Sequence, residues 1–231
     1  SWMMLLFSTS IFCSQYFQLH VCASKMLGSL TYMMTIFQAT CNPLCVIMPM
    51  ERAVILRGYR NGVFAAGPYW LARSTLSVAH SVVSTLLTSL IVYPCLQGPD
   101  KNPMYMIGFW AMIQLFTIAC VFIGLILGMG TPSALAGLKS VPPLMVTMML
   151  TSNLVIPHNK VKWFMTPFQY PNIFTWPGKA LMVILYHHKS EKANYLLTSP
   201  EWFDVHTGNV SHCYVAMVVI DVVLFFFGIG V

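Results

Sequence analysis

The chain has 231 residues, of which 57% are hydrophobic and 8% are charged, and its formal net charge is +6. Because soluble domains carry about 25% charged residues, this composition predicts an integral membrane protein in a lipid bilayer and excludes an ordinary soluble domain. The basic residues gather in one segment or lie scattered instead of lining a solvated face, so no nucleic acid is expected as a partner.

Long apolar runs divide the chain into segments that can cross a bilayer. A helix needs about 20 apolar residues to cross a hydrocarbon core of about 30 Å. The uncharged run from Met104 to Leu138 is too long for one crossing, and the cluster Gly128–Ser133 predicts a break within it. The predicted spans are approximately residues 1–24, 26–50, 74–96, 104–127, 134–156 and 213–231. The predicted fold class is therefore all-α integral membrane: a six-transmembrane-helix bundle that forms a single transmembrane domain over residues 1–231.

Two smaller features bear on this bundle. Gly124 and Gly128 are four residues apart in the fourth predicted span and would let another helix approach closely, which we interpret as ordinary helix packing. The chain begins inside an apolar run and shows no cleavable signal sequence, which we interpret as a piece of a longer protein cut within or near its first span.

All four arginines of the chain lie in one segment between the second and third predicted spans. They are Arg52, Arg57, Arg60 and Arg73, and Glu51 precedes them. Short arginine-rich loops stay on the cytoplasmic side of a membrane. Residues 51–73 are therefore predicted to form a cytoplasmic loop, with both ends of the chain on the same side of the membrane as this loop.

Residues 157–212 are predicted to form a large extracellular segment before the last helix. Pro157, Pro167, Pro171 and Pro177 prevent one straight span, and the aromatic first half suits a re-entrant or interfacial hairpin with its aromatic side chains at headgroup level. Asn209-Val210-Ser211 is a sequon, which predicts glycosylation of Asn209.

Asp221 interrupts the last apolar run, and two interpretations stay open. It is either a buried, functional carboxyl group, or a residue near the outer boundary of a span that is cut short at Val231. We favour the boundary position. No metal, catalytic or cofactor-binding residue is predicted, because the seven cysteines lack zinc-site spacing and His206, His212 and Cys213 have no fixed carboxylate beside them.

The arginine-rich segment carries a longer pattern. Glu51-Arg52, Ile55-Leu56-Arg57, Asn61-Gly62 and Phe64 are followed by Tyr69-Trp70-Leu71-Ala72-Arg73. This pattern resembles the cytoplasmic loop E-R-x-x-F-L-R-E-x-x-N-G-x-Y of the transmembrane domain in ABC exporters of the G subfamily, the white/pigment and PDR-like half-transporters. Weaker likenesses extend over nearly the whole chain. Gly58 replaces the acidic residue of the family pattern, and Lys179 stands where the family usually has Glu.

The resemblance implies the membrane-spanning subunit of an ATP-driven exporter of lipids, sterols or amphipathic xenobiotics. It would work as a homo- or heterodimer with another half-transporter, in the plasma membrane or an endomembrane of a eukaryote. ATP and Mg would bind in a separate nucleotide-binding domain, because this chain has no G-x-x-x-x-G-K-[ST] phosphate loop. A non-pumping channel or a regulatory pseudo-transporter subunit stays open because of Gly58. A membrane-embedded enzyme is less favoured, since only His80 and Asp221 offer reactive groups within spans.

The resemblance also implies site residues. Glu51, Arg52, Arg57 and Arg60 would couple to the nucleotide-binding domain from an amphipathic surface helix, Glu51–Phe64, with Val54, Ile55 and Leu56 facing the bundle. Alternatively, the arginines only set topology and contact lipid headgroups. A substrate cavity on the dimer axis would be lined by Phe37, Thr40, Cys41, Val146, Thr147 and Leu150; alternatively, any of these residues faces lipid or packs in the core of the bundle. Cys213 would form an intersubunit disulfide, as in some relatives, or stay an unpaired thiol.

Overall fold

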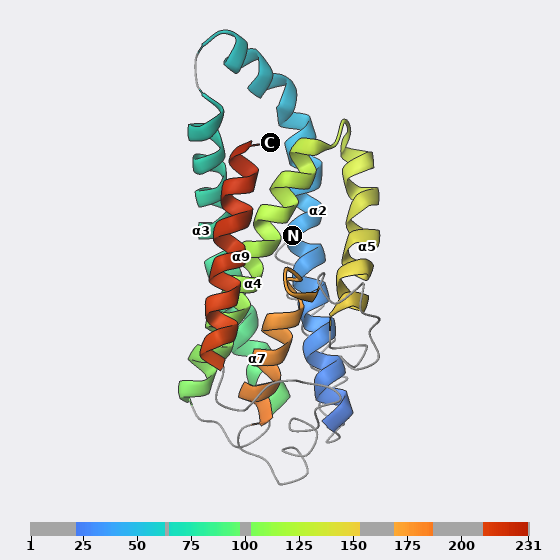
Figure 1. The fold of residues 1–231 in the computed structure, drawn as a ribbon, viewed down its shortest axis with the longest axis vertical. Coiled ribbons are helices and arrows are strands. Elements are labelled where there is room, and N and C mark those ends of the chain that lie inside the picture. The colour runs from blue at the N-terminus through green and yellow to red at the C-terminus, as the bar shows by residue number, and fades with distance from the viewer. Residues whose placement is uncertain (1–21, 63–64, 98–102, 153–168, 187–209, 231) are drawn as a thin grey trace.

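The computed structural model describes residues 22–62, 65–97, 103–152, 169–186 and 210–230, and every regular element within these ranges is a helix. The helices are α2 (Cys22–Arg60), α3 (Ala66–Gln97), α4 (Pro103–Gly130), α5 (Ala134–Thr151), α7 (Thr175–Tyr186) and α9 (Val210–Gly230). All but α7 are long and apolar enough to cross a membrane. They run side by side along the long axis of the molecule (Figure 1), which confirms an all-helical membrane bundle. The predicted first span lies almost wholly outside the described residues, so six spans stay a prediction.

The arginine-rich segment is mostly helical. α2 has 39 residues, and at about 1.5 Å per residue it is about 58 Å long, far longer than a hydrocarbon core requires. Its last part, residues 51–60, extends beyond the ends of α4, α5 and α9 (Figure 1). The N–H groups of Asn61 and Gly62 then donate to the carbonyls of Arg57 (3.0 Å) and Tyr59 (3.1 Å). Gly62 has a φ of 67°, a left-handed conformation that commonly ends a helix and that glycine adopts without strain.

This geometry corrects the predicted surface helix. Residues 51–60 continue α2 without a break, and only residues 61–65 separate α2 from α3. Of the three residues expected to face the bundle, Ile55 alone is partly buried, whereas Val54 is 72% and Leu56 45% exposed. The prediction failed because neighbouring residues of a helix point about 100° apart, so three consecutive side chains cannot share one face.

The predicted break between the fourth and fifth spans is confirmed. α4 ends at Gly130 and α5 begins at Ala134. The hydroxyl of Ser133 accepts a hydrogen bond from the backbone N–H of Ala136 at 3.3 Å, which caps the first turn of α5. The turn therefore returns the chain along the bundle next to α2, with which α5 is in contact.

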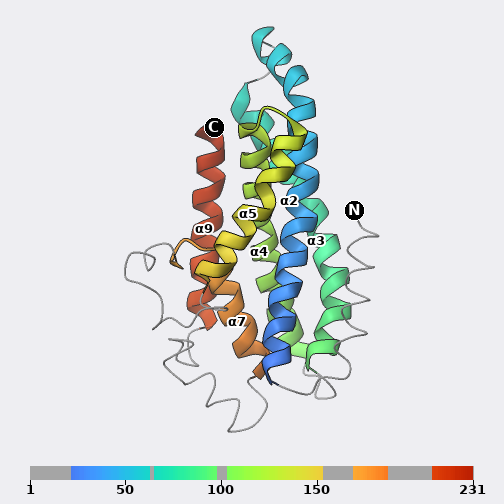
Figure 2. The ribbon, with the colours of Figure 1, turned by 90° about the vertical axis from the view of Figure 1, so that its right-hand side faces the viewer.

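α4 lies at the centre of the bundle, between α9 and α2 in both ribbon views (Figures 1 and 2), and it also contacts α3, α5 and α7. Its close contact with α2 depends on glycine. A Cβ atom at Gly124 would lie 3.2 Å from Cα of Cys41, and one at Gly128 would lie 2.9 Å from the carbonyl oxygen of Leu44. Ordinary packing within the chain, as predicted for Gly124 and Gly128, is confirmed.

Hydrogen bonds between helices fix α2, α3 and α4 relative to one another. The Tyr32 hydroxyl donates to Oγ1 of Thr88 at 3.0 Å, and Nε2 of Gln114 donates to Oγ of Ser81 at 3.1 Å. Thr85 also donates to the side-chain oxygen of Gln114. Such bonds between membrane helices are worth about 0.6–2 kcal/mol each, so they add to the orientation set by packing.

α7 lies inside the bundle at the end away from the arginines (Figure 1) and contacts α2, α4 and α9. Its 12 residues span about 18 Å, which is too short to cross a membrane. Phe174, directly before α7, is fully buried, with its ring centroid 5.7 Å from that of Phe37 and 5.2 Å from that of Phe116. Phe174 is therefore enclosed by the bundle, and the expectation that the aromatic residues of this segment lie at headgroup level stays a prediction. Residues 153–168 and 187–209 of the predicted extracellular segment lie outside the described residues.

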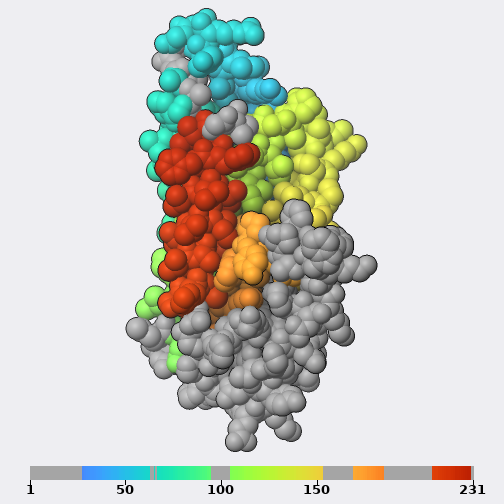
Figure 3. Space-filling view, viewed as in Figure 1, coloured from blue at the N-terminus to red at the C-terminus, as the bar shows by residue number. Residues whose placement is uncertain are grey.

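α9 presents two different faces. Its outer surface is open along the length of the helix in Figure 3, and after the first turn its large exposed side chains are apolar: Val215, Val218, Val219, Val222, Val223, Phe226, Phe227 and Ile229. Such a surface suits contact with lipid tails. Asp221, near the middle of α9, is only 7% exposed. The favoured position of Asp221 at a membrane boundary is therefore wrong, and the buried alternative describes its place.

Candidate functional site at the arginine-rich end

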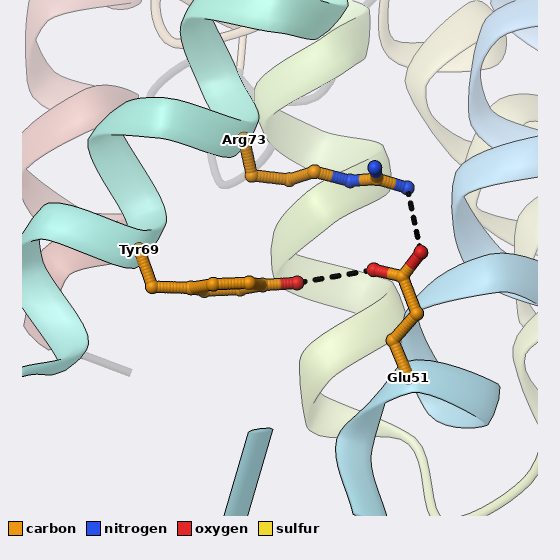
Figure 4. A network of polar contacts seen from close by, with 3 residues as sticks. All are labelled: Glu51, Tyr69 and Arg73. Carbon is orange, nitrogen blue, oxygen red and sulfur yellow. Dashed lines mark hydrogen bonds and ion pairs between the residues drawn. The ribbon is translucent and has the colours of Figure 1, made fainter. Parts of the chain in front are cut away.

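The arginine-rich end, which we define as residues 51–73, is braced by Glu51. Its Oε2 accepts a hydrogen bond from the Tyr69 hydroxyl at 3.1 Å, and its Oε1 forms an ion pair with Arg73 at 3.4 Å (Figure 4). Glu51 belongs to α2, whereas Tyr69 and Arg73 belong to the first turns of α3. The side chain of Arg73 is only 21% exposed, so this pair is less screened by water than a fully exposed pair would be. Glu51 thus ties the two arms of the helical hairpin together.

Arg52 connects the same hairpin to the turn between α4 and α5. Its Nη1 donates to the backbone carbonyl of Thr131 at a long 3.5 Å. Thr131 follows the end of α4 and donates its own N–H to the carbonyl of Leu127 at 3.1 Å. Residues 51–60 therefore contact both α3, through Glu51, and the α4–α5 turn, through Arg52.

Arg57 and Arg60 differ from the other predicted coupling residues. Both lie in the last turn of α2, where cations interact favourably with the helix dipole, and both are exposed. Within the part of the chain that the structure describes, Glu51–Arg73 is the single ion pair, so neither Arg57 nor Arg60 is neutralised there. The structure thus divides the four predicted residues into two that bind within the chain, Glu51 and Arg52, and two cations on the projecting end of α2.

The six predicted cavity residues do not line one common space in this chain. Phe37 packs on Phe174, and the thiol of Cys41 donates to the carbonyl of Cys120 at 3.3 Å; both Phe37 and Cys41 are fully buried. Three others are exposed on α5: Val146, Thr147 and Leu150. Phe37 and Cys41 are therefore packing residues of the bundle. A cavity that the exposed α5 residues would form with a second chain stays a prediction.

Thr40 lines a groove of about 420 Å³ between α2 and α3 that the sequence analysis missed. The α3 wall presents Ser77, Ser81 and Ser84 together with Leu76 and His80, with Arg73 towards one end. A signal for this wall existed, because the three serines are spaced i, i+4, i+7 and so share one helix face. Apolar walls with a few hydroxyl groups are suited to an amphipathic guest.

Cys213 lies in the first turn of α9 and is 3% exposed. Asn209 lies outside the described residues, so its glycosylation stays a prediction. A disulfide between two copies needs sulfur atoms about 2 Å apart, which a buried thiol cannot reach without leaving its site. The geometry therefore favours the unpaired thiol over the intersubunit disulfide.

We expect Cys213 to react with a maleimide at least tenfold more slowly than an engineered thiol at Ser211, which is exposed in the same helical turn. The measurement compares the labelling rates of Ser211→Cys and wild type in detergent, with Cys213→Ser to subtract the other thiols. A dimer band on non-reducing gels that disappears in Cys213→Ser would contradict this arrangement.

Taken together, the apolar helices of the bundle define an integral membrane protein. A family model for ABC-2 type transporters matches residues 1–186, more than half of the chain. The chain belongs to the ABC-2 type transporter family. It is also 23% identical, over 141 residues, to ABC transporter G family member 1 of Dictyostelium discoideum. This match covers 59% of the chain but only 18% of the relative, so the chain corresponds to a small part of that protein.

Proposed function

We propose that this chain is the membrane-spanning subunit of an ATP-driven exporter, and that the projecting end of α2 couples it to a nucleotide-binding domain that binds ATP and Mg. The observation that carries the proposal is the pair of exposed cations on that end, Arg57 and Arg60, which form no ion pair with any described residue. An acidic surface of an ATPase domain would be complementary to them. A movement of the nucleotide-binding domain would then reach the bundle by two contacts. One is the ion pair between Glu51 and Arg73, and the other is the hydrogen bond from Arg52 to Thr131.

The substrates we propose are lipids, sterols or amphipathic xenobiotics. The groove between α2 and α3 supports this class, since it combines apolar walls with the hydroxyl groups of Thr40 and three serines. The apolar face that α5 exposes, with Val146 and Leu150, would pack against or face a second half-transporter, identical or different. Such a partner would complete the cavity that one chain does not form.

We expect the charge reversals Arg57→Glu and Arg60→Glu, made together, to lower ATP-dependent transport at least tenfold while lowering the free energy of unfolding by only about 1–2 kcal/mol, through the loss of two favourable interactions with the helix dipole. The physical reason is that both side chains are exposed, so their loss removes no internal contact, whereas a reversed charge repels an acidic partner surface. Transport of a short-chain fluorescent phospholipid and of a fluorescent sterol is measured in vesicles that contain the subunit with its nucleotide-binding domain. Lys139→Glu, which reverses an exposed cation on α5, is the matched control.

Full transport by the double variant, at equal expression, would overturn the coupling proposal. The alternative is a channel or regulatory subunit that does not pump, which Gly58 favours because it leaves the coupling segment without the acid seen in the family pattern. Under that alternative, vesicles would accumulate neither probe in an ATP-dependent manner, and the charge reversals would have no transport to alter. Restoring the acid with Gly58→Glu separates the two, since it would increase ATP-dependent transport only in a subunit that pumps.

A further inference from the structure

A second cavity, of about 290 Å³, lies at the arginine-rich end and is separate from the α2–α3 groove. Four helices contribute to its wall: α2, α3, α4 and the last turn of α9. The wall is mostly apolar and aromatic, with Tyr59, Tyr69 and Trp70, and Arg52 is its single charged lining residue. A cavity of this size accepts a headgroup with the first part of an acyl chain, although it is too small for a whole phospholipid.

Trp70 lines this cavity and carries a buried hydrogen-bond donor, Nε1. Its side chain is 3% exposed, and Nε1 has no acceptor among the described residues. The six-membered ring of the indole packs on Gly228, because a Cβ atom at Gly228 would lie 2.0 Å from Cζ2, 2.4 Å from Cη2 and 2.8 Å from Cε2. Gly228 itself lines the cavity. Since a buried N–H group without an acceptor is costly, an acceptor oxygen at this wall would stabilise the structure.

The charged residues around the cavity indicate whether it would bind a positively or a negatively charged ligand. Arg52 is exposed, and its one described bond, to the carbonyl of Thr131, is long at 3.5 Å. Arg57 and Arg60 lie further along the same helix end. The nearest acid in sequence, Glu51, is already bound by Tyr69 and Arg73. The local charge is therefore positive, which favours an anion.

We propose that this cavity binds an anionic amphiphile, with its phosphate or carboxylate oxygens at Arg52 and Trp70 Nε1 and its chain along the apolar wall. The cavity lies at the basic end of the bundle, and basic residues near a membrane attract acidic lipids. Binding at this site does not require the proposed transport activity, but the site shares Arg52 with the proposed coupling path. It would make the geometry of the arginine-rich end depend on the lipid composition of the membrane.

The test uses the whole chain in a neutral detergent and dioctanoyl phosphatidic acid as the probe, with binding followed by microscale thermophoresis and by the shift in melting temperature. We expect saturable binding and a rise in melting temperature. Dioctanoyl phosphatidylcholine, which has the same chains without net charge, should bind at least tenfold more weakly. Inorganic phosphate should bind weakly as well, because it lacks the chain; equal protection by inorganic phosphate would show a simple anion site and overturn the amphiphile proposal.

Two variants locate the site. Arg52→Gln removes the charge, and Trp70→Phe removes the N–H donor while keeping an aromatic ring; each should raise the Kd for phosphatidic acid at least fivefold. Arg57→Gln, which removes one charge outside the cavity, is the control and should change the Kd less than twofold. If Trp70→Phe does not fold, Arg52→Lys supplies the second comparison, since it retains the charge and should keep most of the affinity. Unchanged affinity in Arg52→Gln, or equal losses in Arg52→Gln and Arg57→Gln, would overturn the proposal.

Discussion

Replacing Gly128 by leucine is expected to separate α2 from α4 and to lower the melting temperature of the protein strongly. A Cβ atom at this position would lie 2.7 Å from Cβ of Met48 and 2.9 Å from the carbonyl oxygen of Leu44. Both distances are shorter than real Cβ atoms show, and the second neighbour is backbone, which cannot move aside like a side chain. The two helix axes would therefore have to move apart.

Moving α2 and α4 apart lowers the free energy of unfolding by more than the local steric clash alone would. Overpacking a buried site costs about 1–3 kcal/mol, and the α2–α4 contact also holds the thiol of Cys45, whose Sγ lies 3.7 Å from the carbonyl oxygen of Gly124. For a chain of this size, each kcal/mol corresponds to about 2–4 °C. We expect a drop of about 5–10 °C, measured by size-exclusion chromatography after heating in detergent.

Gly130→Leu provides the matched control, because it makes the same chemical change two residues further along α4. A Cβ atom at Gly130 would meet no atom within 4 Å. The better helix propensity of leucine should leave its melting temperature unchanged or slightly higher. Equal melting of both variants would show that α2 and α4 are not in close contact at Gly128.

The close contact at Gly128 is one of the features that the sequence alone predicted. Glycines spaced four apart in a span predict close packing, and the cluster Gly128–Ser133 predicts a chain reversal, because both depend on local stereochemistry. The arginine-rich segment was also located from the sequence, since charge is rare in an apolar chain. These features belong to single segments and do not depend on which helix lies next to which.

The features that sequence reasoning missed depend on the rotation of each helix about its axis. Phe37 and Cys41 are buried, whereas Val146 is 46% exposed, although all three are apolar residues in predicted spans. Lipid tails are as apolar as a bundle interior, so hydropathy does not show which face of a membrane helix is inside. The pairing of Glu51 with Tyr69 and Arg73 was missed for a related reason, since it requires that α2 continue past the membrane boundary.

Because Asp221 is buried, replacing its carboxyl group by an apolar side chain is expected to increase the stability of the protein. Both carboxyl oxygens of Asp221 lack a hydrogen-bond partner among the described residues, and the side chain is 7% exposed. Aspartate at the centre of a membrane helix costs about 2.5–3.5 kcal/mol on insertion. We expect Asp221→Leu to raise the melting temperature by about 5–10 °C. Asp221→Asn, which keeps the shape and a polar group, should change it much less.

Val222→Leu is the control for added volume on the same helix, because Val222 is 48% exposed on the outer side of α9. Its melting temperature should match that of the unaltered chain. A lower melting temperature for Asp221→Leu would contradict the arrangement, since it would mean that the carboxyl group makes a stabilising contact.

The expected gain in stability also matters for function. A chain that keeps an unpaired carboxyl group inside an apolar bundle keeps it at the expense of stability, and in membrane proteins such groups commonly serve function. Transport measured on the stabilised Asp221→Leu variant therefore decides whether the carboxyl group has a role: lost transport in a more stable protein would assign it one, and full transport would show that the bundle works without it.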